Sequence, residues 1–80
     1  MSAVDVTNAV YETVALVAKR NRQELTGDMK IAEDLGLKSM SRIELAALLE
    51  ENLDVKINNF EIRIPKTITE LIELVDKKKA

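Results

Sequence analysis

Two serines stand two positions apart in the segment 33–44, which has the sequence EDLGLKSMSRIE. Ser39 and Ser41 come just before apolar residues with helical spacing, so both lie near the start of a predicted helix. A serine there usually caps the helix by accepting a hydrogen bond from an unpaired backbone N–H group. The same place also suits a hydroxyl that bears a phosphate, because a helix N-terminus attracts anions. The rest of the chain has to decide between a cap and an attachment site.

The chain has few other groups for covalent chemistry. It contains no Cys and no His, which removes thiolate chemistry, the commonest general base and the commonest metal ligands. Its acidic pairs, Glu33 with Asp34 and Glu50 with Glu51, are adjacent in sequence and so point in different directions on a helix. A domain of 80 residues buries only roughly 60–70% of its extended surface, so a deep catalytic cleft is not expected. We therefore expect no enzyme, no catalytic residue and no metal site.

The composition predicts one folded helical domain over residues 1–80, because 46% of the residues are apolar and 32% are charged. The net charge of −2 and the lack of a basic stripe argue against a nucleic-acid partner. The N-terminus lacks the pattern of a signal peptide, and no apolar run approaches the ~20 residues that span a membrane. We expect a cytoplasmic monomer without membrane contact. Met1 and the lysine-rich end favour a stand-alone protein over a piece of a larger synthase.

The first helix is predicted from Ser2, which with Asp5 forms a capping-box pattern, to a charged stretch at 19–23. Its core face is marked by valines at spacings of four and three: Val6, Val10, Val14 and Val17. A long loop with both glycines, Gly27 and Gly36, follows over residues 25–38. We expect Ile31 and Leu35 to pack that loop onto the core.

The second helix is predicted over residues 39–52. Its core face consists of Leu45, Ala46, Leu49 and Leu53. Met40, Ile43 and Ala47 form another apolar face, beside Glu44 and Glu51. Two interpretations stay open for it. It is either part of a wide buried stripe, or a partner-facing surface with an apolar centre and an acidic rim.

In the segment 55–64, apolar residues alternate with polar ones as in a hairpin, but a lone two-stranded hairpin is only marginally stable. We expect instead a short third helix or turn that begins near Asn58 or Asn59, with Ile64 biased away from helical geometry by Pro65. Thr67 and Glu70 form a capping box for the last helix, which ends in three lysines, Lys77, Lys78 and Lys79. Its stripe consists of Ile68, Leu71, Ile72 and Val75.

The pattern resembles that of the acyl carrier proteins. Their signature places an acidic-Leu-Gly turn just ahead of Asp-Ser-Leu at the start of the second helix. The corresponding residues here are Glu33, Asp34, Leu35, Gly36, Leu37, Lys38, Ser39 and Met40, followed by Ile43, Glu44, Leu45, Glu50 and Glu51. The resemblance implies an all-α, four-helix bundle fold with three main helices, a short third helix, and a long loop between helices one and two.

In that family a phosphopantetheinyl transferase attaches 4′-phosphopantetheine to the motif serine, and the terminal thiol carries acyl groups as thioesters. By resemblance, Ser39 is the attachment residue and the partners are the transferase and acyl-transferring or ketosynthase-type enzymes. A lining of Leu45, Leu49, Ile62 and Leu71 is expected for an acyl pocket between the helices. The predicted partner-binding residues are Lys38, Met40, Arg42, Ile43, Glu44, Ala47 and Glu51.

The start of the second helix departs from the family pattern. Lys38 replaces the usual Asp before the serine, and Ser41 replaces another Asp. Ser41 with Glu44 forms a capping-box pattern, which predicts a structural role for Ser41 and leaves Ser39 free for modification. Lys38 and Arg42 oppose the helix macrodipole and are a like-charge i, i+4 pair. We expect them either to repel the basic docking sites of general enzymes, or to contact the phosphate of the arm or solvent.

Three functions therefore stay open. The first is a specialised acyl carrier of a lipid or secondary-metabolite pathway, which the near-neutral charge favours because general carriers are markedly acidic. The second is a carrier of an amino acid or another small acid on the same arm. The third is an unmodified helical adaptor that binds a partner through the face of Met40, Ile43 and Ala47.

Overall fold

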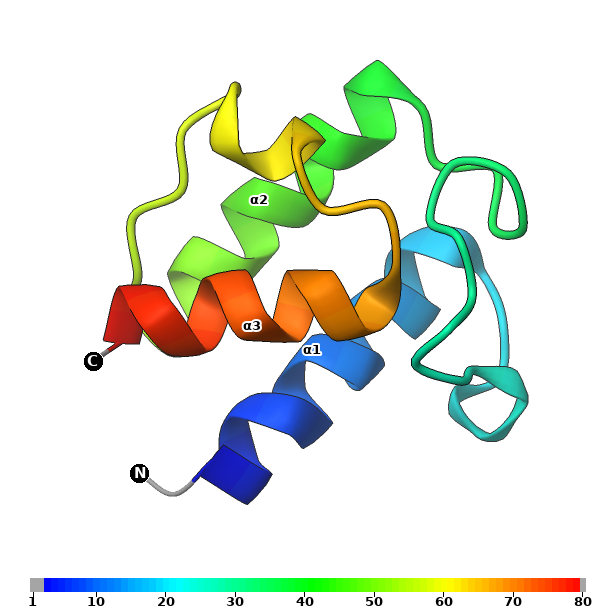
Figure 1. Ribbon diagram of the computed structural model, residues 1–80, viewed down its shortest axis with the longest axis horizontal. Coiled ribbons are helices and arrows are strands. Elements are labelled where there is room, and N and C mark those ends of the chain that lie inside the picture. The colour runs from blue at the N-terminus through cyan, green and yellow to red at the C-terminus, as the bar shows by residue number, and fades with distance from the viewer. Residues whose placement is uncertain (1–2, 80) are drawn as a thin grey trace.

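The computed structural model describes the backbone of residues 3–79 and the side chains of residues 6–79. Its main elements are the helices α1 (Ala3–Ala18), α2 (Ser39–Leu53) and α3 (Ile68–Lys79). Two short 3-10 turns, η1 (Arg22–Glu24) and η2 (Glu61–Arg63), lie in the connections. α1 packs against both α2 and α3, and η2 lies beside the first half of α2 (Figure 1). Residues 3–79 contain no β-strand, so the predicted all-α class is confirmed.

The core face of α1 follows the predicted valine spacing. Val6, Val10 and Val14 are buried, whereas Val17 is only half-buried at the edge of the core. The helix ends at Ala18, slightly before the predicted end, because Lys19 adopts a left-handed conformation with φ 57°. The predicted capping box of Ser2 and Asp5 lies outside the residues whose side chains are described. None of the helices that the structure describes is both long enough and apolar enough to cross a bilayer.

The long loop between α1 and α2 is held to the rest of the fold by both its side chains and its backbone. Four buried side chains anchor it to the core: Leu25, Ile31, Leu35 and Leu37. The packing of Ile31 and Leu35 was predicted. The Ile31 N–H donates to the Lys66 carbonyl at 2.8 Å, and the Thr69 N–H donates to the Gly27 carbonyl at 2.9 Å. A Cβ at Gly27 would collide with Thr69 Oγ1, so a larger residue there would require the Thr69 side chain to turn away.

The segment 55–64 forms the predicted short helical turn rather than a hairpin. The Asn58 side chain accepts hydrogen bonds from the N–H groups of Phe60 and Glu61 at 2.9 and 2.8 Å, which starts η2. The expectation for Ile64 is wrong, because it is helical with φ −72° and ψ −46° although Pro65 follows. The Ile64 N–H donates to the Glu61 carbonyl at 3.2 Å, and this bond closes the turn.

α3 begins with the predicted capping box. The Glu70 N–H donates to Thr67 Oγ1 at 3.2 Å, and the Thr67 N–H donates to the Glu70 carboxylate at 3.3 Å. The far end of α3 is joined to its neighbours by two of the predicted terminal lysines. Lys79 Nζ donates to the Leu53 carbonyl at 2.9 Å, and Lys78 pairs with Glu61 of η2, which lowers the pKa of the Glu61 carboxyl.

Candidate functional site

Ser39 is the first residue of α2 and is exposed to solvent. Lys38 is the N-cap residue, and its side chain makes no capping hydrogen bond. The Arg42 N–H donates the first intrahelical hydrogen bond of α2, to the Lys38 carbonyl at 2.8 Å. The N–H groups of residues 39–41 come before it and therefore have no acceptor within the helix. The first turn also carries no acidic side chain. The helix end beside the Ser39 hydroxyl is therefore positive and not neutralised by the chain itself.

The predicted capping role of Ser41 is wrong. Ser41 is the third residue inside α2, so it is not the N-cap and cannot form the predicted capping box with Glu44. Exposure now separates the two serines, because Ser39 is exposed and Ser41 is half-buried. Ser39 is thus the more accessible hydroxyl for an enzyme that modifies this end of the helix.

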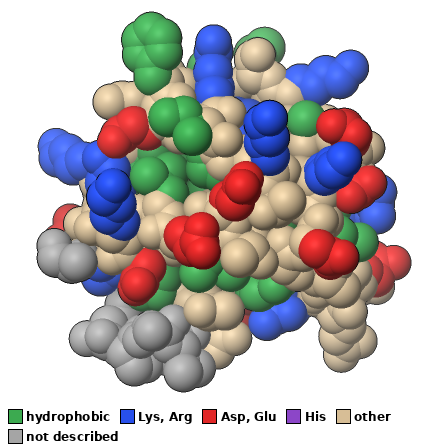
Figure 2. Space-filling view, in the orientation of Figure 1, with side chains coloured by type: hydrophobic (Ala, Val, Ile, Leu, Met, Phe, Trp, Pro, Cys, Tyr) green, Lys and Arg blue, Asp and Glu red, His purple; other side chains and the backbone are tan. Residues whose placement is uncertain are grey.

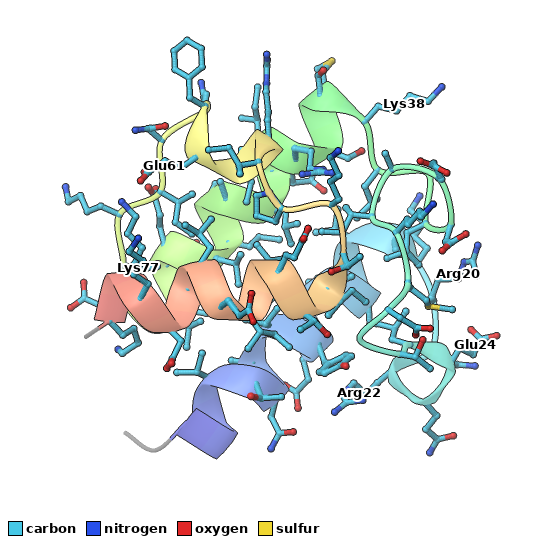
Figure 3. The ribbon with its side chains drawn as sticks, in the orientation of Figure 1. Arg20, Arg22, Glu24, Lys38, Glu61 and Lys77 are labelled. Atoms are coloured by element: carbon cyan, nitrogen blue, oxygen red, sulfur yellow. The ribbon has the colours of Figure 1, made fainter. Side chains whose placement is uncertain are left out.

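A hollow of about 390 Å³ opens beside Ser39. It is lined by Ala32, Leu37, Lys38, Ser39, Arg42 and Arg63, and is called the Ser39 hollow below. Lys38 extends outward from the start of α2 (Figure 3). The lining combines residues from the loop, from α2 and from η2, so three separate segments position this site.

Arg42 is not the exposed cation that the sequence predicted. It is only 8% exposed, and its Nη1 donates to the carbonyls of Ile62 and Pro65 at 2.7 and 2.8 Å. The long side chain reaches these carbonyls because the connection from η2 to α3 passes over this part of α2. Burial lowers the pKa of the Arg42 guanidinium, which nevertheless stays charged at neutral pH. Arg42 is therefore a structural cation, and its predicted role in direct partner binding does not fit this burial.

The outer face of α2 is a surface and not a wide buried stripe. Met40 is 84% exposed, Ile43 is 40% exposed, and Ala47 is exposed beside the exposed carboxylates Glu44 and Glu51. The predicted core face of the same helix is buried: Leu45, Ala46, Leu49 and Leu53. Of the two interpretations of the outer face, the exposure supports the partner-facing one, and partner binding itself stays a prediction.

Two apolar side chains of the segment 60–64 are also exposed, and they were not assigned to a surface from the sequence. Phe60 is 80% exposed and Ile64 is 72% exposed, whereas Ile62 between them is fully buried. Apolar and basic side chains stand next to one another along the upper edge of the molecule, over η2 and the start of α2 (Figure 2).

The predicted acyl-pocket residues come together in the core. Leu45, Leu49, Ile62 and Leu71 are all fully buried, at 0% exposure. The Ser39 hollow is lined by other side chains. An acyl chain could reach the four predicted residues only if α2, η2 and α3 moved apart.

Comparisons with known proteins agree with this geometry. A family model described as "Phosphopantetheine attachment site" matches residues 8–75. The chain belongs to this family, that of the acyl carrier proteins. It is 26% identical to the acyl carrier protein of Chlorobium phaeovibrioides (strain DSM 265 / 1930), over 98% of this chain and 100% of that protein. It is 31% identical to the acyl carrier protein of Cyanophora paradoxa, over 85% of this chain and 66% of that protein.

The residues around Ser39 fit the prosthetic group of the family, which is 4′-phosphopantetheine held covalently. The exposed hydroxyl can accept a phosphoryl group, and the free N–H groups and cations around it favour a phosphodiester anion. When attached, the group supplies a terminal thiol, which a chain without Cys lacks. Ser39, Lys38 and Arg63 are the residues at this site that could hold its phosphate.

We predict that Arg42 and Arg63 differ sharply in their effect on stability, although both line the Ser39 hollow. Arg42→Gln leaves two carbonyls without their donor, and each unpaired buried group costs about 1–3 kcal/mol. Arg63→Gln, at an exposed position, should change stability by no more than about 0.5 kcal/mol. Urea unfolding followed by circular dichroism measures both, with Arg42→Lys expected between them. Equal losses for Arg42→Gln and Arg63→Gln would contradict the structural role of Arg42.

Proposed function

We propose that this protein is a specialised acyl carrier that bears 4′-phosphopantetheine on Ser39 and delivers acyl groups to enzymes of a lipid or secondary-metabolite pathway. The observation that carries the proposal is the exposed Ser39 hydroxyl at the uncapped start of α2, within the matched family region. The chain itself is not an enzyme in this proposal. Its work is to present the arm, and the chemistry of acyl transfer belongs to the partners.

The proposed attachment of the arm requires from this chain only the Ser39 hydroxyl, and no catalytic group. Ser39 Oγ forms a bond to the phosphorus next to pantetheine in a diphosphate ester such as coenzyme A. The P–O bond between this phosphorus and the nucleotide phosphate breaks, and the nucleotide leaves with its own phosphate group. In this proposal a general base of the phosphopantetheinyl transferase takes the serine proton.

We predict that Ser39→Ala abolishes phosphopantetheine attachment and that Ser41→Ala retains it. The chain is produced with a broad-specificity transferase, and intact-mass spectrometry detects the added group. Ser39 is not the N-cap, so its loss removes no cap and circular dichroism should remain helical. If Ser41→Ala removes the label and Ser39→Ala keeps it, the assignment of the two serines is reversed.

The tight packing of the core favours a second candidate, a carrier of an amino acid or another small acid. A medium-length acyl chain needs space between the helices, but the four predicted lining residues have no exposed surface. A small cargo needs no such space and can stay in solvent at the end of the arm. The acyl and small-acid candidates share the arm on Ser39 and differ in whether the core opens.

We predict that a medium-length acyl chain on the arm raises the melting temperature relative to the free thiol. Each methylene that enters the core contributes about 0.8 kcal/mol, provided that it fits. Calorimetry of the two forms measures the shift, with an acetyl group as the control that is too short to reach the core. A medium-length chain that shifts melting no more than acetyl does would favour the small-acid carrier.

We propose that the partners dock on the outer face of α2, and that Lys38 selects among them. Met40, Ile43 and Ala47 would supply the apolar contact, and Glu44 and Glu51 the acidic rim. Lys38 is the exposed cation at the head of this face, so a proper partner should carry an acidic residue opposite the Ser39 end. Enzymes with basic docking sites for acidic carriers should therefore associate slowly with this protein.

We predict that Lys38→Asp speeds attachment of the arm by a narrow-specificity transferase, and that added salt reduces the gain. Exposed charges are screened within about 10 Å at 0.1 M salt. Lys38→Asn is the matched control, because Asn and Asp both cap a helix while Asn adds no negative charge. The rates should rise from Lys to Asn to Asp at low salt. Equal attachment rates for Lys38→Asn and Lys38→Asp at every salt concentration would contradict selection by charge.

A further inference from the structure

The Ser39 hollow is strongly basic, although the protein as a whole is slightly acidic. Three of its lining residues are cations, Lys38, Arg42 and Arg63, and none of its lining residues is acidic. The formal net charge of the chain is −2. Lys38 and Arg42 are expected near Ser39 from the sequence, whereas Arg63, which lies 24 positions after Ser39, is not.

Lys38 and Arg63 are free to bind a ligand. In the part of the chain whose side chains are described, neither cation has a hydrogen bond or an ion pair with another residue. Other cations of the chain are engaged, such as Lys78 with Glu61 and Lys30 with Glu33. Two unpaired cations at one hollow repel each other, and an anion between them would relieve that repulsion.

Arg42 supplies a positive charge that is held in one place beside the hollow. Its guanidinium is held by the carbonyls of Ile62 and Pro65, which are neutral and so carry no charge that offsets its own. It also lines a second hollow of about 350 Å³, with Ala32, Lys30, Glu33 and Lys66. Cations along a recess with low-dielectric walls focus the field and attract anions.

We infer that the Ser39 hollow is an anion site that holds the phosphodiester of the arm on Ser39, with Lys38 and Arg63 as its ligands and buried Arg42 as its fixed charge. This inference rests on the proposed function. The hollow includes the attachment residue itself, so the phosphate is at its edge as soon as the bond forms. The arm therefore leaves the protein from a fixed point and in a restricted direction, instead of rotating freely about Ser39.

A carboxylate of a docked partner is the competing occupant of the same hollow. The phosphodiester is favoured because it is covalently tethered and reaches the cations at an effective concentration that no separate partner matches. A tethered phosphate also requires no complementary protein surface. The two occupants can be distinguished in the isolated modified protein. There the phosphodiester can occupy the hollow, whereas a partner carboxylate is absent.

The test compares the modified wild-type protein with modified Arg63→Gln, after intact mass has shown attachment in both. Phosphorus-31 NMR measures how freely the phosphate moves. Nitrogen-15 NMR measures which backbone amides shift on modification. In the wild type, attachment should shift the amides of Ala32 and Arg63, which are distant in sequence from Ser39, and the phosphorus should relax as an immobilised group. In Arg63→Gln the Ala32 shift should shrink and the phosphorus relaxation should approach that of a free phosphodiester.

Arg22→Gln is the matched control, because Arg22 is an exposed arginine that lies away from Lys38 and stacks on Tyr11 (Figure 3). It should leave both signals as in the wild type. Identical phosphorus relaxation in wild type and Arg63→Gln, with amide shifts confined to residues 38–42, would overturn the inference. So would slower transfer to a partner enzyme in Arg63→Gln with an unchanged phosphorus signal, which would assign the hollow to a partner carboxylate.

Failure of attachment is a separate result, since an unchanged mass would overturn the proposed function and not the hollow. The hollow is then tested on the unmodified chain, by titration with free phosphopantetheine and with pantetheine, which lacks the phosphate. The inference requires the Ala32 and Arg63 amides of the wild type to shift with phosphopantetheine only, and the Ala32 shift to be lost in Arg63→Gln. Equal shifts with both compounds would contradict it.

Discussion

The buried guanidinium of Arg42 holds the functional end of the molecule together. Its two short hydrogen bonds join α2 to the carbonyls of Ile62 and Pro65, on either side of the turn that leads from η2 to α3. A buried charge is costly unless it is well bonded, so the connection has to run close over α2 for this residue to be tolerated. The same contact helps to place η2 with Arg63 and the exposed side chains on either side of it, Phe60 and Ile64.

A second set of contacts fixes the other side of the Ser39 hollow. The backbone of the long loop pairs with the start of α3, through the bonds from Ile31 to Lys66 and from Thr69 to Gly27. The buried side chains of the loop reinforce this pairing. The segment that ends in Lys38 and Ser39 is therefore anchored although it has no regular secondary structure. A rigid support of this kind fixes the geometry of an exposed site better than a mobile loop would.

Most elements of the fold could be predicted from the sequence, and the errors fall where one residue contacts a distant part of the chain. The apolar spacing of Leu45, Leu49, Leu71 and Val75 reports burial directly, so α2 and α3 were placed within a residue or two. Arg42 was expected to be exposed because a cation on a helix usually is, and no local pattern reveals carbonyls twenty residues away. The error about Ser41 has a similar cause, since a capping pattern does not say which residue starts the helix.

The charges around Ser39 favour the binding of an anion at this site. A lysine at an N-cap position gives up the usual capping bond, and it places a positive charge at the positive end of the helix dipole. Arg42 and Arg63 add charge of the same sign at the same hollow, and the first turn offers no carboxylate to offset it. Local conflicts of this kind are expected at functional sites, where a ligand supplies the missing partner. An Asp at position 38 would remove the conflict in the unmodified chain, but it would repel a phosphodiester on Ser39. Lys38 instead leaves the unmodified site electrostatically incomplete, and in the proposed function attachment of the arm to Ser39 would supply the compensating negative charge.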